Sequence, residues 1–134
     1  MRIVNMGCVL ALALLMSACA PMVASTPVDF TPMAGATASK AKDLQLRTPA
    51  ELVLPTGYSR VLAANSQWRA VGRIPQGTVY RPVDSVFSIE GRQVHEAYLV
   101  IDRNAALKGF YLPGEARYSP LDKPVQLSTT GELQ

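Results

Sequence analysis

The chain has 134 residues, and its 13 Lys and Arg against 10 Asp and Glu give a formal net charge of +3. Its arginines are interleaved with acids, which does not favour nucleic acid as a partner, because proteins that bind nucleic acid gather Lys and Arg on one face. Both cysteines, Cys8 and Cys19, stand near the N-terminus. The rest of the chain therefore has no cysteine nucleophile, no thiolate zinc site and no disulfide.

Residues 1–18 are expected to be a targeting segment. One positive charge, at Arg2, precedes an apolar stretch from Ile3 to Met16. A membrane-spanning helix needs about 20 apolar residues, so this shorter stretch is typical of the hydrophobic region of a signal peptide. Ala18 stands just before Cys19, and small residues at that place are what a signal peptidase accepts.

Residues 15–19 read LMSAC. This motif resembles the lipobox of bacterial lipoprotein precursors, with Met16 in place of the usual leucine, and the resemblance covers residues 1–19 only. It implies cleavage between Ala18 and Cys19, and acylation of Cys19 by a diacylglyceryl thioether and usually an amide-linked chain such as palmitate. Two or three such chains hold a protein on the bilayer effectively permanently. The alternatives are a transmembrane anchor, or an ordinary secretory signal with an incidental cysteine.

The residue after the cysteine bears on localisation. Ala20, and not an aspartate, follows Cys19. In lipoproteins of enterobacteria-like Gram-negative cells, an aspartate there tends to retain the protein in the inner membrane. The resemblance therefore implies the outer membrane of the cell envelope, and leaves open whether the domain faces the periplasm or the cell surface.

Composition divides the mature chain into three parts. Residues 19–47 are rich in Pro, Ala, Ser and Thr without a sustained apolar period, which predicts a lipidated cysteine followed by a flexible tether. Such a tether would span ~30 Å root-mean-square as a coil and up to ~90 Å when stretched. Residues 48–128 are expected to form one small β-rich domain, near the lower size limit at which a core suffices. Residues 129–134 are expected to be a disordered tail.

The domain is expected to be mainly β, a small antiparallel meander or partly open barrel with at most one or two short helices. Short runs of branched and aromatic residues alternate with turn signals, such as Pro75 and Gly77, at a spacing of about 8 to 12 residues that is typical of such folds. Residues 86–101 predict a hairpin that turns at Glu90 and Gly91.

Three local features refine this expectation. Residues 48–54 fit either a helix of one to two turns, with Pro49 at its first position, or a short strand at residues 52–54. Residues 59–68 could hold a brief helix. Further along, Pro113 and Gly114 predict a type II turn.

The search for chemistry centres on His95, the only histidine. A serine hydrolase would need it beside a serine and a carboxylate, such as Ser88 and Asp102, but no Gly-x-Ser-x-Gly turn is present. Glu90 and Glu115 could in principle flank a glycosidic bond, yet their spacing is also that of ordinary solvated charges. Catalysis is therefore not favoured, and no cofactor is expected.

A metal site at His95 and Glu96 is not favoured either. Adjacent side chains on a strand point to opposite faces of the sheet, so these two residues could not easily hold one ion. The same alternation leaves one face of the sheet free to present polar side chains for contact. The possible binding surface consists of Arg92, His95, Glu96, Tyr98 and Lys108.

Two functions from different classes remain. The first is a lipid-anchored envelope protein with a non-catalytic β-rich domain for binding or structure, for example a component of a secretion, conjugation or envelope-assembly complex. Its partners are the lipid bilayer, through acylated Cys19, and another envelope protein, with no nucleic acid or metal. The alternative is a small envelope enzyme, or enzyme inhibitor, that uses a cleft near His95.

Overall fold

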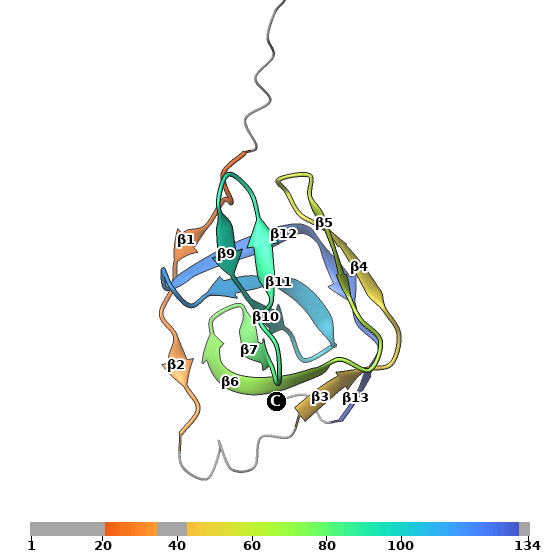
Figure 1. Ribbon diagram of the computed structural model, residues 1–134. Helices are drawn as coiled ribbons and strands as arrows, with labels where there is room; N and C mark the ends of the chain where they lie inside the picture. The colour runs from red at the N-terminus through yellow and green to blue at the C-terminus, as the bar shows by residue number, and fades with distance from the viewer. Residues whose placement is uncertain (1–20, 35–42, 132–134) are drawn as a thin grey trace, which may run out of the picture.

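The computed structural model describes residues 21–34 and 43–131, which fold into antiparallel β-structure (Figure 1). Within these ranges every regular element is a strand. The expectation of a mainly β, antiparallel and open architecture is confirmed. In the same ranges no helix is long and apolar enough to cross a membrane.

The strands follow one another in short steps along the chain. Their bounds are β1 (Thr26–Pro27), β2 (Thr31–Pro32), β3 (Asp43–Leu46), β4 (Ala50–Val53), β5 (Ser59–Leu62), β6 (Gln67–Ile74), β7 (Gly77–Pro82), β8 (Ser88–Glu90), β9 (Val94–Glu96), β10 (Tyr98–Ile101), β11 (Ala106–Leu112), β12 (Arg117–Gln126) and β13 (Thr129–Thr130).

One main sheet carries most of these strands, in the order β1-β12-β11-β10-β7-β6-β3-β13, with β2 added on β6. The hairpins β4–β5 and β8–β9 pair only within themselves. In Figure 1 the main sheet curls, and the β4–β5 hairpin stands at one side of it. Of the hairpin predicted over residues 86–101, only residues 88–96 pair, as β8–β9, with residues 91–93 between the strands. The predicted turn at Glu90 and Gly91 is wrong, because Glu90 pairs with Val94, and residues 98–101 form β10, which pairs with β7 and β11.

Burial explains why the strands form where they do. Along β6 the buried side chains of Trp68 and Ala70 alternate with exposed residues, the period-two pattern of a strand with one face in the core. A bulge between Ala70 and Gly72 interrupts this pattern, and the buried Ile74 beyond it packs in a different apolar cluster. Strand β10 differs, because Leu99, Val100 and Ile101 are all buried. A strand buried on consecutive residues has apolar contacts on both of its faces.

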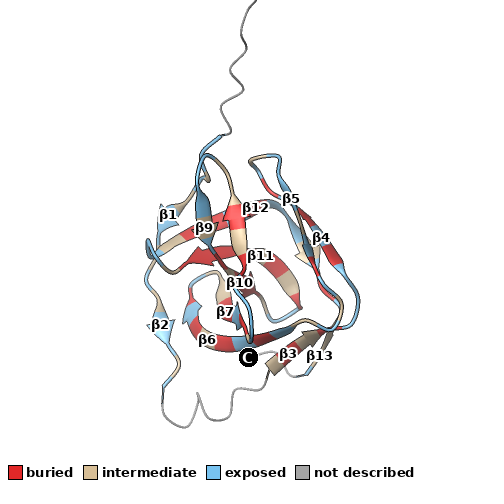
Figure 2. Ribbon diagram, in the orientation of Figure 1, coloured by how far each residue is buried: buried red, intermediate tan, exposed pale blue. Residues whose placement is uncertain are grey.

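Those two faces belong to two separate hydrophobic clusters (Figure 2). The larger cluster contains the hairpins' inward residues, such as Leu52 and Ile89, together with Tyr80, Leu99 and Phe110 of the main sheet. The smaller cluster consists of buried residues from the five strands β6, β7, β10, β11 and β12. They are Ile74, Val79, Val100, Tyr111 and Tyr118.

The N-terminal strap, which we define as residues 21–34, covers the smaller cluster. Its strand β1 pairs with β12, and its strand β2 pairs with β6, so one short segment links two strands that lie apart in the sheet order. Between them, Val28 and Phe30 pack on the smaller cluster, and the Phe30 ring stacks on Tyr111 with centroids 4.8 Å apart.

The prediction that residues 19–47 form a tether is wrong for their described part. Besides the strap, strand β3 lies within the main sheet, and its residues Leu44 and Leu46 have no exposed surface. The composition misled because Pro27 and Pro32 sit in two-residue strands at sheet edges, where proline is tolerated. The apolar residues between the two prolines, Val28 and Phe30, pack on the smaller cluster, and their spacing has no regular period.

The predicted tail is also partly wrong. Thr129 and Thr130 form β13 and pair with Leu46 and Gln45 of β3. A two-residue strand leaves no periodic signal in a sequence, and here pairing with β3 holds the segment in place. Only residues 132–134 of the predicted tail lie outside the described residues.

Both predicted short helices are replaced by the β4–β5 hairpin. Its strands pair from Ala50 opposite Leu62 to Val53 opposite Ser59, so of the two readings of residues 48–54 the strand is the correct one. The burial of β4 alternates strictly, which places Leu52 in the larger cluster. Tertiary packing thus outweighs the helix-start signals at Thr48 and Pro49.

The prediction of a type II turn at residues 113–114 is wrong. A type II turn needs a positive φ at its third residue, which would be Gly114. Among the described residues the positive φ in this connection belongs to Ala116, at 52°. The amide of Glu115 donates to the carbonyl of Leu112 over 3.2 Å. The connection is therefore a four-residue loop between the pair Leu112 and Arg117.

Candidate functional site

A cleft of ≈630 Å³ lies between the start of the N-terminal strap, strand β9 and the β11–β12 connection. We call it the strap cleft. Its size falls within the range of small-ligand sites, about 300–1,000 Å³. Its lining is partly polar and partly apolar, and consists of Met22, Val23, Ala24, Ser25, Arg92, Gln93, His95, Leu112, Glu115 and Arg117.

A histidine–carboxylate pair lies in the strap cleft. The Nδ1 atom of His95, on β9, is 2.8 Å from Oε1 of Glu115, in the β11–β12 connection. The His95 side chain is 18% exposed and that of Glu115 is 42% exposed, so the pair is reachable from solvent. The hydrogen bond uses one ring nitrogen and leaves Nε2 of His95 to face a ligand.

A second polar contact fixes the strap side of the cleft. The guanidinium of Arg117 donates from Nε to the Ser25 hydroxyl over 2.8 Å, and from Nη2 to the Ser25 carbonyl over 2.6 Å. A two-point contact of this kind gives geometric specificity as well as energy. Arg117 is therefore held in place by the strap, and Arg92 is the exposed cation of the cleft.

The polar side chains of the cleft can bind a ligand. His95 and Arg92 can donate to an anionic or carbonyl group, while Glu115 can accept. Nucleophilic catalysis would need a hydroxyl or thiol within hydrogen-bond reach of the histidine. Among the described residues no hydroxyl group bonds to His95. The same residues hold no cluster of three or more His, Cys, Asp or Glu side chains that would suit a metal ion.

The structure divides the predicted binding surface. Arg92 and His95 line the strap cleft, whereas Glu96, Tyr98 and Lys108 do not. Tyr98 instead packs on the smaller hydrophobic cluster, with its ring 6.4 Å from that of Tyr111. Burial, and then the negative charge of Glu96, raise the pKa of Tyr98. The five residues therefore do not form one continuous site, while Ala18 and Cys19 lie outside the described residues.

The serine and carboxylates considered for catalysis have other roles. The Asp102 carboxylate accepts hydrogen bonds from the amides of Asn104 and Ala106 over 2.8 and 3.0 Å, which stabilises the β10–β11 connection. Ser88 lies opposite Glu96 in the β8–β9 ladder, and His95 lies opposite Ile89. The triad of Ser88, His95 and Asp102 is not supported.

Of the ten residues that line the strap cleft, the predicted binding surface contains only Arg92 and His95. Glu115 was considered only as one of two carboxylates, without His95, and Met22 and Ser25 were assigned to a tether. No spacing pattern joins His95 to Glu115, because their contact depends on how the β8–β9 hairpin lies over the β11–β12 connection. The one usable signal was the turn sequence around Pro113, which places Glu115 in an exposed loop.

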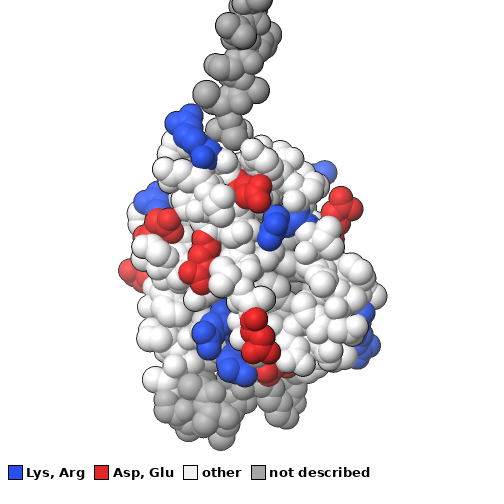
Figure 3. Space-filling model, viewed as in Figure 1, with Lys and Arg blue, Asp and Glu red and all other residues white. Residues whose placement is uncertain are grey.

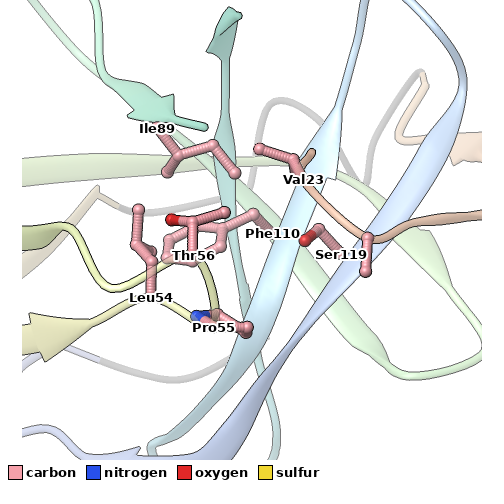
Figure 4. Close-up of a pocket in the computed structure, with 8 residues that line it drawn as sticks. Val23, Leu54, Pro55, Thr56, Ile89, Phe110 and Ser119 are labelled. Atoms are coloured by element: carbon pink, nitrogen blue, oxygen red, sulfur yellow. The ribbon is translucent and has the colours of Figure 1, made fainter. Parts of the chain in front are cut away.

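The other cavities are less suited to a ligand. Figure 4 shows one between the strap, the β4–β5 turn and strands β11 and β12, lined by residues such as Val23, Leu54 and Phe110. Its volume of ≈10 Å³ is about the limit for one water molecule, so it is a packing gap. Two shallower hollows, of ≈270 and ≈260 Å³, lie beside Trp68 and at the β6–β7 turn.

The sequence matches no family model, and comparisons with curated proteins and with solved structures find no significant relative. Function is therefore argued from this chain's own residues.

Proposed function

We propose that the chain is a lipid-anchored protein of the cell envelope whose β-rich domain binds another envelope protein in the strap cleft. The anchor is inferred from the LMSAC motif, whose resemblance to a lipobox implies that Cys19 is acylated. The observation that carries the binding role is the cleft itself, which presents a solvent-accessible pair, His95 and Glu115, beside the exposed Arg92.

The lining of the cleft indicates the chemistry of the partner. Arg92 offers a charged donor, and His95 and Glu115 offer one further polar contact each. Met22 and Leu112 add apolar surface in the same cleft. A protein segment that carries a carboxylate next to an apolar side chain would satisfy both kinds of group. Figure 3 shows acidic and basic side chains interspersed over the visible face, which favours a protein partner over a polyanion such as nucleic acid.

A small enzyme, or enzyme inhibitor, is the second candidate. The contact of 2.8 Å between His95 and Glu115 favours it, because a carboxylate that orients a histidine is a common part of acid–base catalysis. For an enzyme, replacing His95 by Ala would abolish the activity and leave the melting temperature unchanged. The absence of a hydroxyl bonded to His95 among the described residues is why we place binding first.

Two measurements test the proposal. The first is the intact mass of the protein from the membrane fraction, beside a Cys19→Ser variant. We expect the wild-type mass of residues 19–134 plus the acyl additions, and an unprocessed or released variant. An unmodified, soluble wild type would overturn the anchor.

The second measurement is photo-crosslinking in intact membranes. A photoreactive residue at Gln93, in the cleft and exposed, is compared with one at Asp84, an exposed loop position outside the cleft. We expect a defined protein adduct from position 93 only, which Arg92→Glu weakens. Equal adducts from both positions, or none from position 93, would contradict binding in the strap cleft.

A further inference from the structure

We infer that the domain lies directly on the bilayer, with Met22 and Arg92 in the headgroup layer and the mouth of the strap cleft beside the membrane. We call these two residues the anchor rim. This inference rests on the proposed acylation of Cys19 and adds to it the position and orientation of the domain.

The short sequence distance between Cys19 and the fold is the first observation that supports this position on the bilayer. Cys19 precedes Pro21 by two residues, so their Cα atoms are at most ~7 Å apart. The carbonyl of Pro21 already accepts a hydrogen bond from the amide of Arg92 over 3.0 Å. The chain is therefore attached to the β8–β9 turn almost at once after Cys19. The ~90 Å reach expected of a stretched tether is not available while the strap is docked.

Several contacts hold the strap in this place. A Cβ on Gly91 would lie 2.8 Å from the Pro21 carbonyl oxygen and 2.9 Å from Val23, so the strap passes close over the β8–β9 turn. Arg117 holds Ser25 at two points, and the amide of Val28 donates to the Ala116 carbonyl over 3.2 Å. Because these contacts hold the strap at successive positions, the strap is part of the folded domain and is not a flexible tether.

The chemistry of the anchor rim suits a headgroup layer. The Met22 side chain is 66% exposed, and Arg92 is exposed beside it. Figure 3 shows basic side chains next to the point at which the described chain begins. Arginine pairs with lipid phosphate, and a flexible apolar side chain enters the upper acyl region. The headgroup region is about 5–8 Å thick on each side of the bilayer. A rim whose chain starts at most ~7 Å from an acylated Cys19 therefore lies within this region or at its outer edge.

The rim orients the domain and does not hold it. One basic residue near an anionic surface contributes only a weak attraction, and Glu90 beside the same turn partly offsets it. The acyl chains supply the attachment. It follows that a partner of the strap cleft, which shares Met22 and Arg92 with the rim, must lie in the membrane or within a few ångströms of it.

The test measures depth at single positions in the full lipidated chain. Residues 20–134 contain no cysteine, so Met22→Cys and Val86→Cys each give one site for a nitroxide label if Cys19 is acylated. Val86 is 76% exposed and lies beyond the other end of strand β8 from Arg92, at most ~20 Å away along the chain. The protein is placed in vesicles of phosphatidylethanolamine and phosphatidylglycerol, and collision of each label with a water-soluble nickel complex is measured.

We expect about five-fold less collision at position 22 than at position 86, because the headgroup layer excludes the polar complex. A flexible insert of 20 Gly and Ser residues between Ala20 and Pro21 is the matched control. It leaves the lipobox intact and should raise collision at position 22 to the level of position 86. Equal collision at the two positions in the parent chain, or no change with the insert, would overturn the inference.

The wild-type chain distinguishes a failure of the proposed anchor from a failure of the inferred position of the domain. It should take no label, because the thiol of Cys19 is acylated. Labelling of the wild type would refute the proposed anchor and the inference together. An unlabelled wild type with a fully accessible position 22 would refute the inference alone.

Discussion

At the scale of single residues, the loop between β11 and β12 contains an alanine in a conformation that favours glycine. Ala116 has φ = 52°, and a left-handed conformation costs a residue with a Cβ about 1–2 kcal/mol. We expect Ala116→Gly to raise the free energy of unfolding by about 0.5–1 kcal/mol, since glycine removes that cost but adds freedom to the unfolded chain. Urea denaturation measures the change.

Ala63→Gly is the matched control for this variant. Ala63 is exposed in the β5–β6 connection and has no positive φ. Glycine there should lower stability slightly or leave it unchanged. A loss of stability in both variants would mean that the backbone at residue 116 is not strained.

Two glycines, one in β11 and one in the β11–β12 connection, should respond differently to replacement by alanine. A Cβ on Gly109 would lie 2.4 Å from the carbonyl oxygen of Ser119 and 2.8 Å from Pro120 Cα. A Cβ on Gly114 would meet nothing within 4 Å. We expect Gly109→Ala to cost more than about 2 kcal/mol, because backbone atoms must move, and Gly114→Ala to stay within about 0.5 kcal/mol. Equal thermal midpoints for the two variants would refute the close approach of β11 and β12.

The pair of Asp43 and Arg69 links stability to pH. Their side chains meet at 2.8 and 3.1 Å, and this hydrogen bonding lowers the pKa of Asp43 below its ordinary value of 3.8. The unfolded chain therefore takes up the proton first as pH falls. The stabilisation is present above pH 3.8 and is lost as pH falls through the folded value.

We expect Asp43→Asn to flatten the fall in the denaturation midpoint between about pH 5 and pH 2. The effect is small, because the pair is partly exposed and screened by solvent. A slope in Asp43→Asn equal to that of the wild type would show that the pair makes no difference between the folded and unfolded chains.

At the scale of elements, the strap depends on a glycine in β6. A Cβ on Gly72 would lie 2.3 Å from the Phe30 ring and 2.7 Å from the Thr31 carbonyl oxygen. We expect Gly72→Ala to release the strap and to cost about 1–3 kcal/mol, because part of the smaller cluster becomes exposed. Limited proteolysis should then cut within residues 21–34, which stay protected in the wild type.

Phe30→Ala provides the comparison for this experiment. It removes the ring that the new methyl group would strike, so the double variant should lose less stability than the two single losses added together. Strictly additive losses would show that Phe30 and Gly72 do not pack on each other. Protection of residues 21–34 in Gly72→Ala would contradict the docking argument directly.

The sequence predicts those elements whose signals are local. The β8–β9 hairpin follows from Gly91 between two short apolar runs, and the β6–β7 turn follows from Pro75 and Gly77. The strap and β13 are formed by long-range pairing of two-residue segments, which have no periodicity of their own. The β4–β5 hairpin carries a helix-start signal at Pro49, and there burial of Leu52 in the core decides against it.

At the scale of the whole molecule, the strap cleft joins segments that are far apart in the chain. His95 and Arg92 come from the β8–β9 hairpin, Glu115 from the β11–β12 connection and Ser25 from the strap. The sequence indicates His95 because it is the only histidine, and Arg92 because it is a charged residue on the predicted exposed face of the sheet. The sequence could not indicate the others, because the cleft exists only when the strap is docked.

The C-terminal end of the described chain forms β13, which lies at the opposite end of the main sheet's strand order from β1. Thr129 pairs with Leu46, and the amide of Arg47 donates to the Ser128 carbonyl over 2.8 Å. Strand β3, which supplies the fully buried Leu44 and Leu46, thus lies between β6 and β13. Without β13 one edge of β3 would have open amide and carbonyl groups, which favour fraying or pairing with other chains.

Truncation tests this directly. We expect a chain that ends at Ser128 to lose about 1–3 kcal/mol of stability, because unpaired backbone groups and loosened packing at Leu46 weaken β3. A chain that ends at Gly131 keeps β13 and should match the wild type. Thermal denaturation compares the two, and hydrogen exchange at the amides of residues 43–46 locates the change. If both truncations behave alike, β3 is held by β6 and the core alone, and β13 does not contribute to stability.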